Sequence, residues 1–459
     1  MGQFLTPAPI AEFMASLFSV TSAPLRLLDA GAGYGALSCA VLDHRRTKRA
    51  NDSVTAYELD TAVAEQLAES LSAYPAVTVE VRECDFLGSA AGLIRRGERP
   101  FNRAILNPPY KKIPSSGPAR QNARDAGLET VNLYSAFVGL ALELLEPQGE
   151  LVAIIPRSFA NGLYYKPFRQ WILKRSAIRH IHLFDSRTSA FSDDAVLQEN
   201  IIIVLERDGV QRDVTVTHST DGTFSDLRQT SVPFSQIVNP SDRESYIRIP
   251  DGTPDPIADS AKIRCEIREL GCDVSTGPVV DFRAREHLCQ EPEPGAVPLL
   301  YSQHFSGDRT TWPVAGKKPN AIRVHPETEK MLWPAGCYVV VRRFSSKEER
   351  RRIVASVVDP SVFQGCERVG FENHLNVFHS RKSPLSPEFA YGLAAYLNSE
   401  QLDDHLRRFS GHTQINATDL RNIPYPSADA LVALGAWLID NRKVEQAKWE
   451  EKIAELFSE

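Results

Sequence analysis

Three short groups of glycine, acidic and aromatic residues near the start of the chain could bind a ligand that contains a nucleoside. In DAGAGYG, Gly31 and Gly33 allow the backbone to turn tightly and to approach a ligand closely. Glu58, in AYELD, could accept hydrogen bonds from both hydroxyl groups of a ribose. In CDF, Asp85 could accept a hydrogen bond from an adenine amino group while Phe86 lies against the ring. Together these residues predict a cofactor site.

A fourth group, NPPY at residues 107–110, directly follows a short apolar run. Two consecutive prolines end a strand, because each lacks a backbone N–H and fixes φ at about −65°. The group presents the amide of Asn107 and the ring of Tyr110 on either side of a rigid pair. No GxxxxGK[ST] segment occurs, and the glycine spacing is GxGxG rather than GxGxxG, which disfavours a P-loop enzyme and weakens a dehydrogenase interpretation.

These groups are expected at the carboxyl ends of buried strands, where open sheets bind ligands. Helical patterns lie between the strands at 36–44, 61–73, 131–146 and 164–174. This alternation predicts an α/β fold with a doubly wound, mostly parallel sheet, whose last two strands form an antiparallel pair at one edge. Residues 111–128 are expected to form a long mobile loop. The predicted strands are Leu25–Leu28, Val54–Tyr57, Val77–Val81, Ala104–Leu106, Leu151–Ile155, Ile178–Phe184 and Ile201–Leu205.

Composition narrows the class of protein. No apolar run approaches the ~18 residues that cross a membrane, and no basic segment precedes an apolar one at the N-terminus, so neither a membrane protein nor a secreted one is expected. Seven cysteines without a CxxC pair indicate reduced thiols in a cytoplasm, and the histidines show no metal-ligand spacing. The formal net charge of −6 argues against general nucleic-acid binding but allows a local basic surface.

The segments DAGAGYG, ELD, CDF and NPPY, in this order, resemble the amino-methyltransferases that use S-adenosyl-L-methionine. The resemblance is strongest to the γ group of DNA adenine-N6 methyltransferases from restriction–modification systems, because all the additional mass follows residue 205. It implies a Rossmann-like methyltransferase fold. It also implies S-adenosyl-L-methionine as cofactor, with these binding residues: Thr6 (in GQFLTP), Asp29, Gly31, Gly33, Glu58, Asp85, Phe86 and Asn107.

The same resemblance implies roles for the fourth group. The lone pair of an adenine amine is delocalised into the ring. Hydrogen bonds from the amine to Asn107 Oδ1 and the Pro108 carbonyl oxygen would help the nitrogen become pyramidal and point its lone pair at the methyl group. Tyr110 would stack on the target base, which must leave the duplex to reach such a pocket. In SAFSDDAVLQENIIIVL, Phe191 would pack on the other face of the base, and Phe184 is the alternative.

Past about residue 235, prolines and glycines multiply, and a second domain of short strands and loops is expected, with helix periodicity returning at 386–406. The predicted organisation is a methyltransferase domain at 1–235, a mixed α+β target-recognition domain at 236–426 and a C-terminal helix within 427–459. VVVRRFSSKEERRR and GHTQINATDLRNIPYP are the segments expected to contact DNA. The candidate DNA contacts are Lys111, Lys112, Arg342, Arg343, His412 and Gln414.

The predicted substrate is therefore double-stranded DNA, methylated at adenine N6, with a separate restriction enzyme acting on the same site. Two alternatives share the NPPY chemistry: N5-glutamine protein methyltransferases and RNA guanine-N2 methyltransferases. A third alternative is a non-catalytic DNA-binding protein on a methyltransferase scaffold. Asn107 favours adenine over cytosine N4, and the recognition sequence and oligomeric state stay open.

Overall fold

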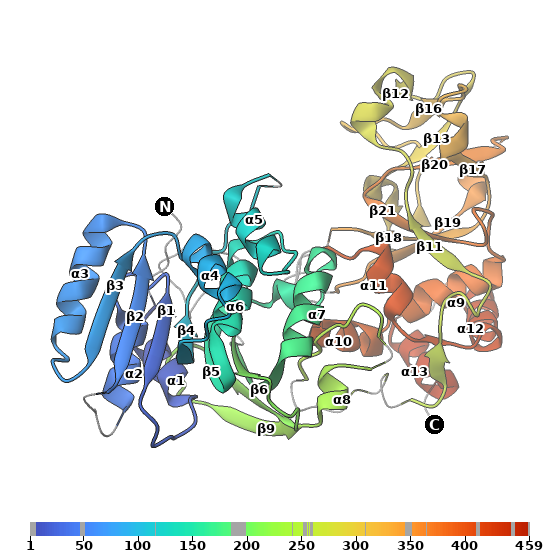
Figure 1. The fold of residues 1–459 in the computed structure, drawn as a ribbon. Helices are drawn as coiled ribbons and strands as arrows, with labels where there is room; N and C mark the ends of the chain where they lie inside the picture. Colours follow the sequence, from blue (N-terminus) through green and yellow to red (C-terminus); the bar gives the residue numbers. More distant parts are fainter. Residues whose placement is uncertain are drawn as a thin grey trace. The chain divides into compact units, whose positions relative to one another are not determined.

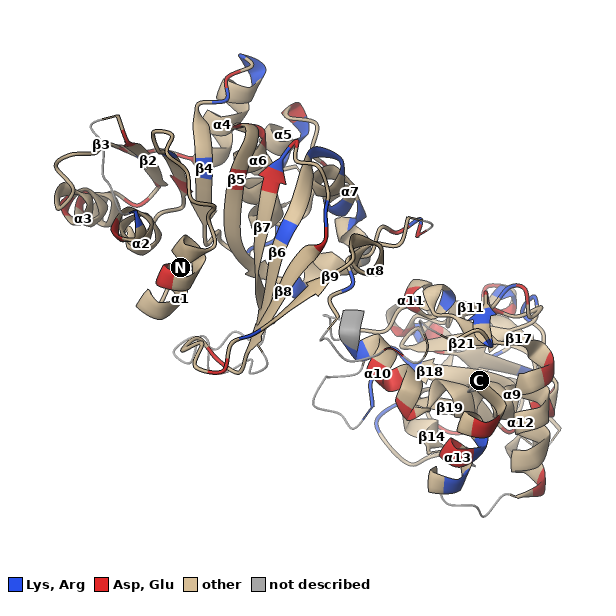
Figure 2. Ribbon diagram, turned by 90° about the horizontal axis from the view of Figure 1, so that it is seen from below, with Lys and Arg blue, Asp and Glu red and all other residues tan. Residues whose placement is uncertain are grey.

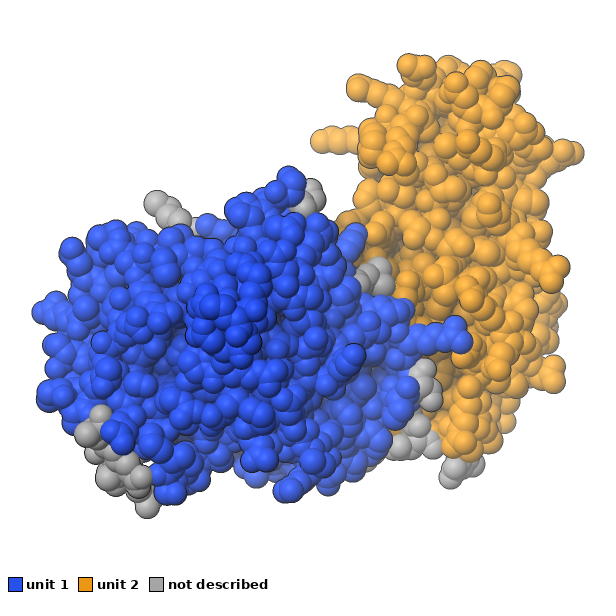
Figure 3. Space-filling model, in the orientation of Figure 1, with its two compact units in different colours: residues 1–253, 408–411 blue, residues 254–407, 412–459 orange. Residues whose placement is uncertain are grey.

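The computed structural model describes most of the chain as two compact units, each presented by itself below. The first comprises residues 1–253 and 408–411, and the second comprises residues 254–407 and 412–459 (Figure 3). Within the described residues, no helix is long and apolar enough to cross a membrane. The described residues are 6–45, 51–114, 116–184, 199–240, 242–250, 255, 257, 260–307, 309–344, 351–363, 365–409, 414–441 and 446–457.

A nine-stranded sheet with the order β3-β2-β1-β4-β5-β7-β6-β8-β9 forms the centre of the first unit (Figure 1). The strands from β3 to β5 run parallel, and β7 pairs antiparallel with both β5 and β6. This arrangement confirms the predicted doubly wound, mostly parallel sheet. The strands are β1 (Arg26–Ala30), β2 (Ser53–Glu58), β3 (Thr78–Glu83), β4 (Phe101–Leu106), β5 (Leu145–Pro156), β6 (Ser176–Phe184), β7 (Asn200–Arg207), β8 (Val214–Ser219) and β9 (Arg228–Val232).

Helices cover both faces of this sheet. Residues of α4, α5, α6 and α7 share one apolar core, and residues of α1, α2 and α3 share another. The strands between the two cores are apolar on both faces, and β4 is buried along its whole length. The helices are α1 (Ala8–Ser16), α2 (Ala36–His44), α3 (Thr61–Ser72), α4 (Phe86–Arg95), α5 (Pro118–Asp125), α6 (Leu133–Glu143), α7 (Lys166–Arg175) and α8 (Phe234–Ile237).

Two expectations for this unit are wrong. The antiparallel pair β6 and β7 does not lie at the sheet edge, because β8 and β9 extend the sheet beyond it. Residues 111–128 contain the helix α5, which begins with Pro118 at a position where a missing N–H costs nothing. Arg120 and Arg124, one helical turn apart, both bind Glu129 and hold α5 to the chain that follows it.

The second unit has the expected mixed α+β character. It contains a four-stranded sheet (β11-β21-β18-β19), a five-stranded sheet (β12-β16-β13-β20-β17) and two two-stranded pairs (β10-β22, β14-β15). The strands are β10 (Ile263–Cys265), β11 (Asp273–Thr276), β12 (Leu288–Cys289), β13 (Ala296–Leu300), β14 (Phe305–Ser306), β15 (Arg309–Thr310), β16 (Ala321–Arg323), β17 (Leu332–Pro334), β18 (Tyr338–Arg342), β19 (Ala355–Val358), β20 (Arg368–Phe371), β21 (Leu375–His379) and β22 (Tyr425–Pro426).

The helices of this unit are α9 (Pro387–Leu397), α10 (Glu400–Phe409), α11 (Ala417–Asn422), α12 (Ala428–Asp440) and α13 (Gln446–Phe457). The single helix predicted over 427–457 is therefore two helices, because Asn441 leaves the helical conformation with φ −119°. Helix α12 packs on α9 so closely that a Cβ at Gly435 would lie 1.7 Å from the Glu388 carbonyl oxygen. The expected boundary at residue 235 lies inside α8, whereas the first compact unit continues to residue 253.

Candidate active site

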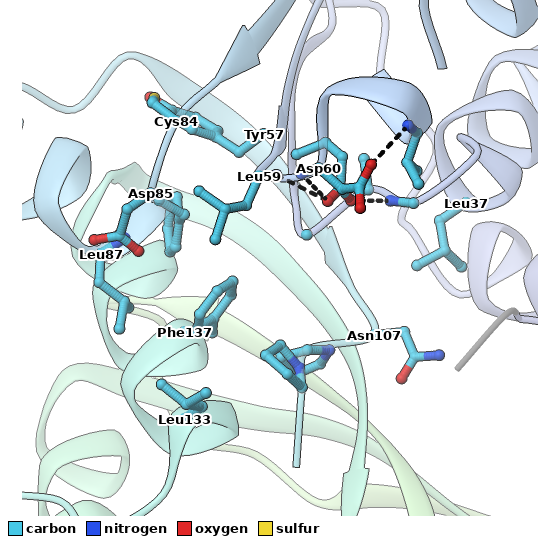
Figure 4. A pocket seen from close by; sticks show the side chains of 18 of the residues that line it. Leu37, Tyr57, Leu59, Asp60, Cys84, Asp85, Leu87, Asn107, Leu133 and Phe137 are labelled. Atoms are coloured by element: carbon cyan, nitrogen blue, oxygen red, sulfur yellow. Dashed lines mark hydrogen bonds between the residues drawn. The ribbon is translucent and has the colours of Figure 1, made fainter. Parts of the chain in front are cut away.

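A cavity of about 490 Å³ lies where β1, β2, β3 and β4 end at their carboxyl edge (Figure 4). Its volume falls in the range of ~300–1,000 Å³ that small-molecule sites occupy. Four of the predicted groups meet here, since the four strands are neighbours in the sheet. The lining includes these predicted site residues: Thr6, Gly31, Gly33, Glu58, Asp85, Phe86, Asn107, Pro108 and Lys111.

The glycine turn joins β1 to α2 in a conformation that other residues rarely adopt. Gly33 has φ 54° and Gly35 has φ 87°. A Cβ at Gly35 would lie 2.8 Å from Leu67 Cδ1, so this glycine serves the packing of α2 on α3. A Cβ at Gly33 would meet no described atom within 4 Å, so this part of the backbone faces open space in the cavity. Gly33 is thus the position where a ligand can approach the main chain.

Glu58 ties the end of β2 to the glycine turn. Its side chain is almost fully buried. Oε2 accepts a hydrogen bond from the Gly33 N–H at 3.0 Å, and Oε1 accepts from the N–H groups of Leu59 and Asp60 at 2.8 and 3.0 Å. These backbone bonds fix the orientation of the carboxylate where it lines the cavity. The position and chemistry of Glu58 fit the predicted ribose contact.

Asp85 begins the helix α4, which the sequence prediction missed. Its carboxylate accepts from the N–H groups of Leu87 at 3.3 Å and Gly88 at 2.8 Å, as a helix N-cap does. Phe86 is buried between Tyr57 and Phe137, with ring centroids 5.2 and 5.1 Å away. Together they close the end of the cavity opposite the glycine turn with one carboxylate and an aromatic wall, which suits an adenine ring.

Asp29 behaves differently from the other cofactor candidates, because it does not line the cavity. It is fully buried at the end of β1 and accepts a hydrogen bond from Ser38 Oγ at 2.7 Å. Burial raises the pKa of this carboxyl group to about 7, with the nearby Glu58 adding to the rise. The geometry therefore places Asp29 behind the glycine turn as a support.

Asn107 is held from two sides at the end of β4. Its Nδ2 donates to Thr6 Oγ1 at 3.0 Å, which brings a residue that precedes α1 to the end of β4. Its Oδ1 accepts from the Tyr110 hydroxyl at 3.1 Å, and this hydroxyl also lies 3.3 Å from the Ile154 carbonyl oxygen at the end of β5. The amide orientation is thus set by a donor on one side and an acceptor on the other.

Tyr110 packs beside the cavity without lining it. Its ring meets Tyr134 edge to face at 6.2 Å, and Tyr134 stacks on Tyr165 at 5.6 Å. Burial raises the pKa of Tyr110, which therefore stays a neutral hydrogen-bond donor. Sequence reasoning missed Tyr134 and Tyr165, because Tyr134 lies in an apolar helical pattern that reads as ordinary core. Asn132 holds the Tyr165 hydroxyl, which completes the support behind Tyr110.

The DNA-contact candidates separate into three groups. Lys111 and Lys112 are exposed directly after NPPY, and Lys111 lines the cavity. In the second unit, β18 ends at Arg342, and Phe344 forms an isolated antiparallel bridge with Gln414, so the two predicted DNA segments are neighbours. The candidates Phe191 and His412 lie outside the described residues. Phe184, the alternative to Phe191, is buried against His182 in the core of the first unit.

One group of possible metal ligands occurs among the described residues. His287, His325 and Glu327 place one ligand atom each within 4.8 Å of one another in the second unit. None of the three lines the cavity. All seven cysteines are free thiols.

Comparisons with known proteins identify the family. Residues 43–191 match the model of the Eco57I restriction-modification methylase family. The chain is 46% identical to the type II methyltransferase M.BsuBI of Bacillus subtilis, over 99% of this chain and 94% of the relative. It is 40% identical to the type II methyltransferase M.PstI of Providencia stuartii, over 99% of this chain and 92% of the relative.

A solved structure extends the likeness to the fold of both units. The type IIL restriction-modification enzyme MmeI, solved in complex with DNA, matches with a TM-score of 0.52 and 11% identity, over 94% of this chain and 69% of that one. The chain belongs to the type II methyltransferases of restriction–modification systems. It is a site-specific DNA methyltransferase, and its cofactor is S-adenosyl-L-methionine, whose ribose and adenine match the chemistry of Glu58, Asp85 and Phe86 in the cavity.

Proposed function

We propose that this enzyme methylates N6 of an adenine in duplex DNA, after the base has turned out of the helix. The observation that carries the proposal is the position of Asn107. Its amide lies between the cofactor cavity and Tyr110, on a strand end that Pro108 and Pro109 stiffen. A reactive atom placed there would face the cavity beside the end of β4, on the other side of β1 from Asp85, and a base inside a duplex could not reach it.

The residues at this strand end suit the chemistry of an exocyclic amine. S-adenosyl-L-methionine supplies an electrophilic methyl group when bound. Asn107 Oδ1 and the Pro108 carbonyl oxygen each accept a hydrogen bond from one N–H of the amine, which localises the nitrogen lone pair and directs it toward the cavity. Thr6 and Tyr110 fix the plane of the amide before substrate arrives. Such fixed placement of reacting groups accounts for a large part of many enzymatic accelerations.

The base needs aromatic surfaces beside these acceptors. We propose that Tyr110 contacts one face of the adenine and Phe191 the other. Lys111 and Lys112, exposed directly after Tyr110, would hold the phosphates that flank the target nucleotide. Stacking between two rings would offset the free-energy cost of unpairing the base, by ~1–3 kcal/mol for each stacking contact.

The larger organisation follows from this reaction. Residues 236–426 are proposed to recognise the DNA sequence, and 427–459 to support them through the packing of α12 on α9. A separate restriction enzyme that cleaves the same unmethylated site is the proposed partner, and the cytoplasm is the proposed compartment. The alternative protein-directed and RNA-directed activities lack a comparable use for the large second unit.

The test is nucleoside analysis of DNA treated with the purified enzyme and S-adenosyl-L-methionine. Mass spectrometry should find N6-methyladenine with the wild-type protein and none with Asn107→Ala. The variant should still bind S-adenosyl-L-methionine in calorimetry, because Glu58 and the glycine turn remain. N4-methylcytosine as the product, or full activity of Asn107→Ala, would contradict the proposal.

A further inference from the structure

A small surface of the second unit combines aromatic, cationic and hydrogen-bonding side chains. It lies where β18 ends and where the turn before β21 begins, and we call it the Phe344 surface. Three chain segments that are far apart in the sequence form it, and the backbone joins them. Its members are Arg342, Arg343, Phe344, His374 and Gln414.

Backbone hydrogen bonds fix the three segments against one another. The Arg343 N–H donates to the His374 carbonyl oxygen at 2.9 Å, and the Ile415 N–H donates to the Arg343 carbonyl oxygen at 2.8 Å. The buried Asn376 donates from Nδ2 to the Ile415 carbonyl oxygen at 2.7 Å. Phe344 pairs with Gln414 in an antiparallel bridge. The surface therefore has a rigid frame, although its side chains come from three places.

Two large side chains of this frame stay exposed. Phe344 is 49% exposed, and the His374 side chain is 46% exposed. Their ring centroids are 5.2 Å apart at an interplanar angle of 42°. Two exposed rings this close together offer a flat surface on which a nucleic-acid base could stack.

Glu372 gives His374 a fixed orientation. This carboxylate is 1% exposed, and it accepts from the His374 N–H at 3.0 Å and from His374 Nδ1. Burying a carboxylate is costly unless its hydrogen bonds are made. Both hydrogen bonds that the Glu372 carboxylate accepts within the described residues come from His374, whose side chain is exposed. With Nδ1 bound to Glu372, Nε2 is the free ring nitrogen, and it makes no hydrogen bond within the described part of the chain.

The arginines of the surface differ from other arginines of the same unit. Arg323 and Arg368 each form an ion pair, with Glu293 and Glu329. Neither Arg342 nor Arg343 has a carboxylate within ion-pair distance among the described residues; their guanidinium groups contact the carbonyl oxygens of Phe305 and Asn373 at 3.3 and 3.5 Å. Uncompensated positive charge beside an aromatic ring suits a polyanion that also offers flat bases.

We propose that the Phe344 surface contacts duplex DNA and that His374 is a specificity-determining residue, which reads one base edge through Nε2. Glu372 is its positioning residue, Phe344 packs beside the same base, and Arg342 and Arg343 neutralise phosphates. The inference rests on the proposed function, since it supplies the sequence reading that site-specific methylation needs. A fixed hydrogen-bonding group facing the major groove can distinguish one base pair from another, whereas a phosphate contact cannot.

The test is methylation of a DNA library with randomised sites, followed by sequencing of the modified positions. His374→Ala should lose discrimination at one position of the recognition sequence by ~5- to 150-fold, the equivalent of one lost base contact. Glu372→Gln, which keeps the size of the side chain, should lose part of this discrimination. Phe344→Ala should weaken binding to every site. Phe282→Ala removes an exposed phenylalanine of the same unit that lies outside the Phe344 surface, and this variant should match the wild type.

The outcomes separate the two proposals. If the wild type methylates the library but His374→Ala keeps full discrimination at every position, the role of His374 is overturned and the proposed function stands. If the wild type methylates protein or RNA but no DNA, both fail. Thermal unfolding of each variant checks folding; His374→Ala keeps the backbone N–H bond to the buried Glu372 but removes the Nδ1 bond, so its Tm should fall while its unfolding stays a single cooperative transition.

Discussion

Asn107 lies at the point where the cofactor cavity meets the proposed base pocket, and two neighbours control its amide. Thr6 accepts from Nδ2 and Tyr110 donates to Oδ1, so the oxygen faces Tyr110 and the nitrogen faces the N-terminal segment. Thr6 comes from the start of the chain and Tyr110 from three residues downstream. The amide of Asn107 is therefore held in this way only when α1 has packed and residue 6 has reached the end of β4.

Removing the hydroxyl of Thr6 should slow the reaction without abolishing cofactor binding. Thr6→Val keeps the shape of the side chain but removes the acceptor for Asn107 Nδ2. One hydrogen bond contributes ~1 kcal/mol, so kcat should fall about 5-fold. Thr6→Ser keeps the hydroxyl group, so its kcat should stay close to that of the wild type. Steady-state kinetics would measure both variants; full activity of Thr6→Val together with a loss in Thr6→Ser would show that the methyl group, and not the hydrogen bond, is what matters.

Asp29 should make the folded state sensitive to pH. Its pKa rises from 3.8 to about 7 on folding because the carboxyl group is buried. The folded protein thus holds this proton more tightly than the unfolded chain does, and the stabilising contribution falls as pH rises from about 4 to about 7. Asn at this position can keep the bond from Ser38 and has no proton to lose.

The comparison is urea unfolding of the wild type and Asp29→Asn at pH 5 and pH 7.5, without cofactor. Between pH 5 and pH 7.5 the variant should gain stability relative to the wild type by up to ~3 kcal/mol. An identical pH dependence in both proteins would show that Asp29 does not titrate in this range.

At the scale of elements, the sequence was most informative where local patterns decide the structure. The glycine turn and Glu58 were predictable, because a turn needs positive φ at glycine and the strand end supplies the acid within the same βαβ unit. The strands β4 and β5 were predictable from continuous apolar runs. Helix α4 was missed because Gly88 and Gly92 interrupt its pattern, and α5 because its face is almost entirely polar.

Contacts between distant segments were beyond prediction from one sequence. The Tyr110 hydroxyl reaches the Ile154 carbonyl oxygen only because β4 and β5 are neighbours. His374 meets Phe344 only because β21 pairs with β18. Neither pairing leaves a signal in the residues concerned, so Glu372 and His374 read as ordinary surface residues until the sheet is known.

The contact between α9 and α12 offers a test at the element scale. A Cβ at Gly435 would lie 1.7 Å from the Glu388 carbonyl oxygen, and one at Gly392 would lie 1.8 Å from that of Leu431. Gly435→Ala should therefore separate the helices and lower the free energy of unfolding by about 3 kcal/mol.

Gly92→Ala is the matched control, because it also lies in a helix but its Cβ would stay 3.6 Å from Arg96. This change should be neutral or stabilise by up to ~1 kcal/mol, since alanine favours helices. Urea unfolding measures both; a tolerated Gly435→Ala would mean that the two helices are not in contact as described.

For the whole molecule, the formal net charge of −6 requires that DNA binding be local. Basic and acidic segments are interspersed over both units, as Figure 2 shows. DNA must therefore be held by particular cations without carboxylate neighbours rather than by an overall attraction. Arg342 and Arg343 have this property among the described residues of β18 and its end.

The double variant Arg342→Ala/Arg343→Ala should change the salt dependence of DNA binding. Each phosphate contact adds about 0.9 to the slope of log K against log salt concentration, so the slope should become shallower by ~1–2. Fluorescence anisotropy at several salt concentrations gives the slopes. Arg323→Ala is the control, because Arg323 already forms an ion pair with Glu293. An unchanged slope in the double variant would show that neither arginine contacts phosphate.

The central claim is methyl transfer to adenine N6 at one short DNA sequence, with Asn107 as the catalytic amide. Single-molecule sequencing of genomic DNA from a host that expresses the wild type, compared with Asn107→Ala, tests it most directly. The wild type should place N6-methyladenine at nearly every copy of one sequence, and the variant should place none. Unmodified genomic DNA, modified cytosine, or the same methylation pattern with Asn107→Ala would contradict it.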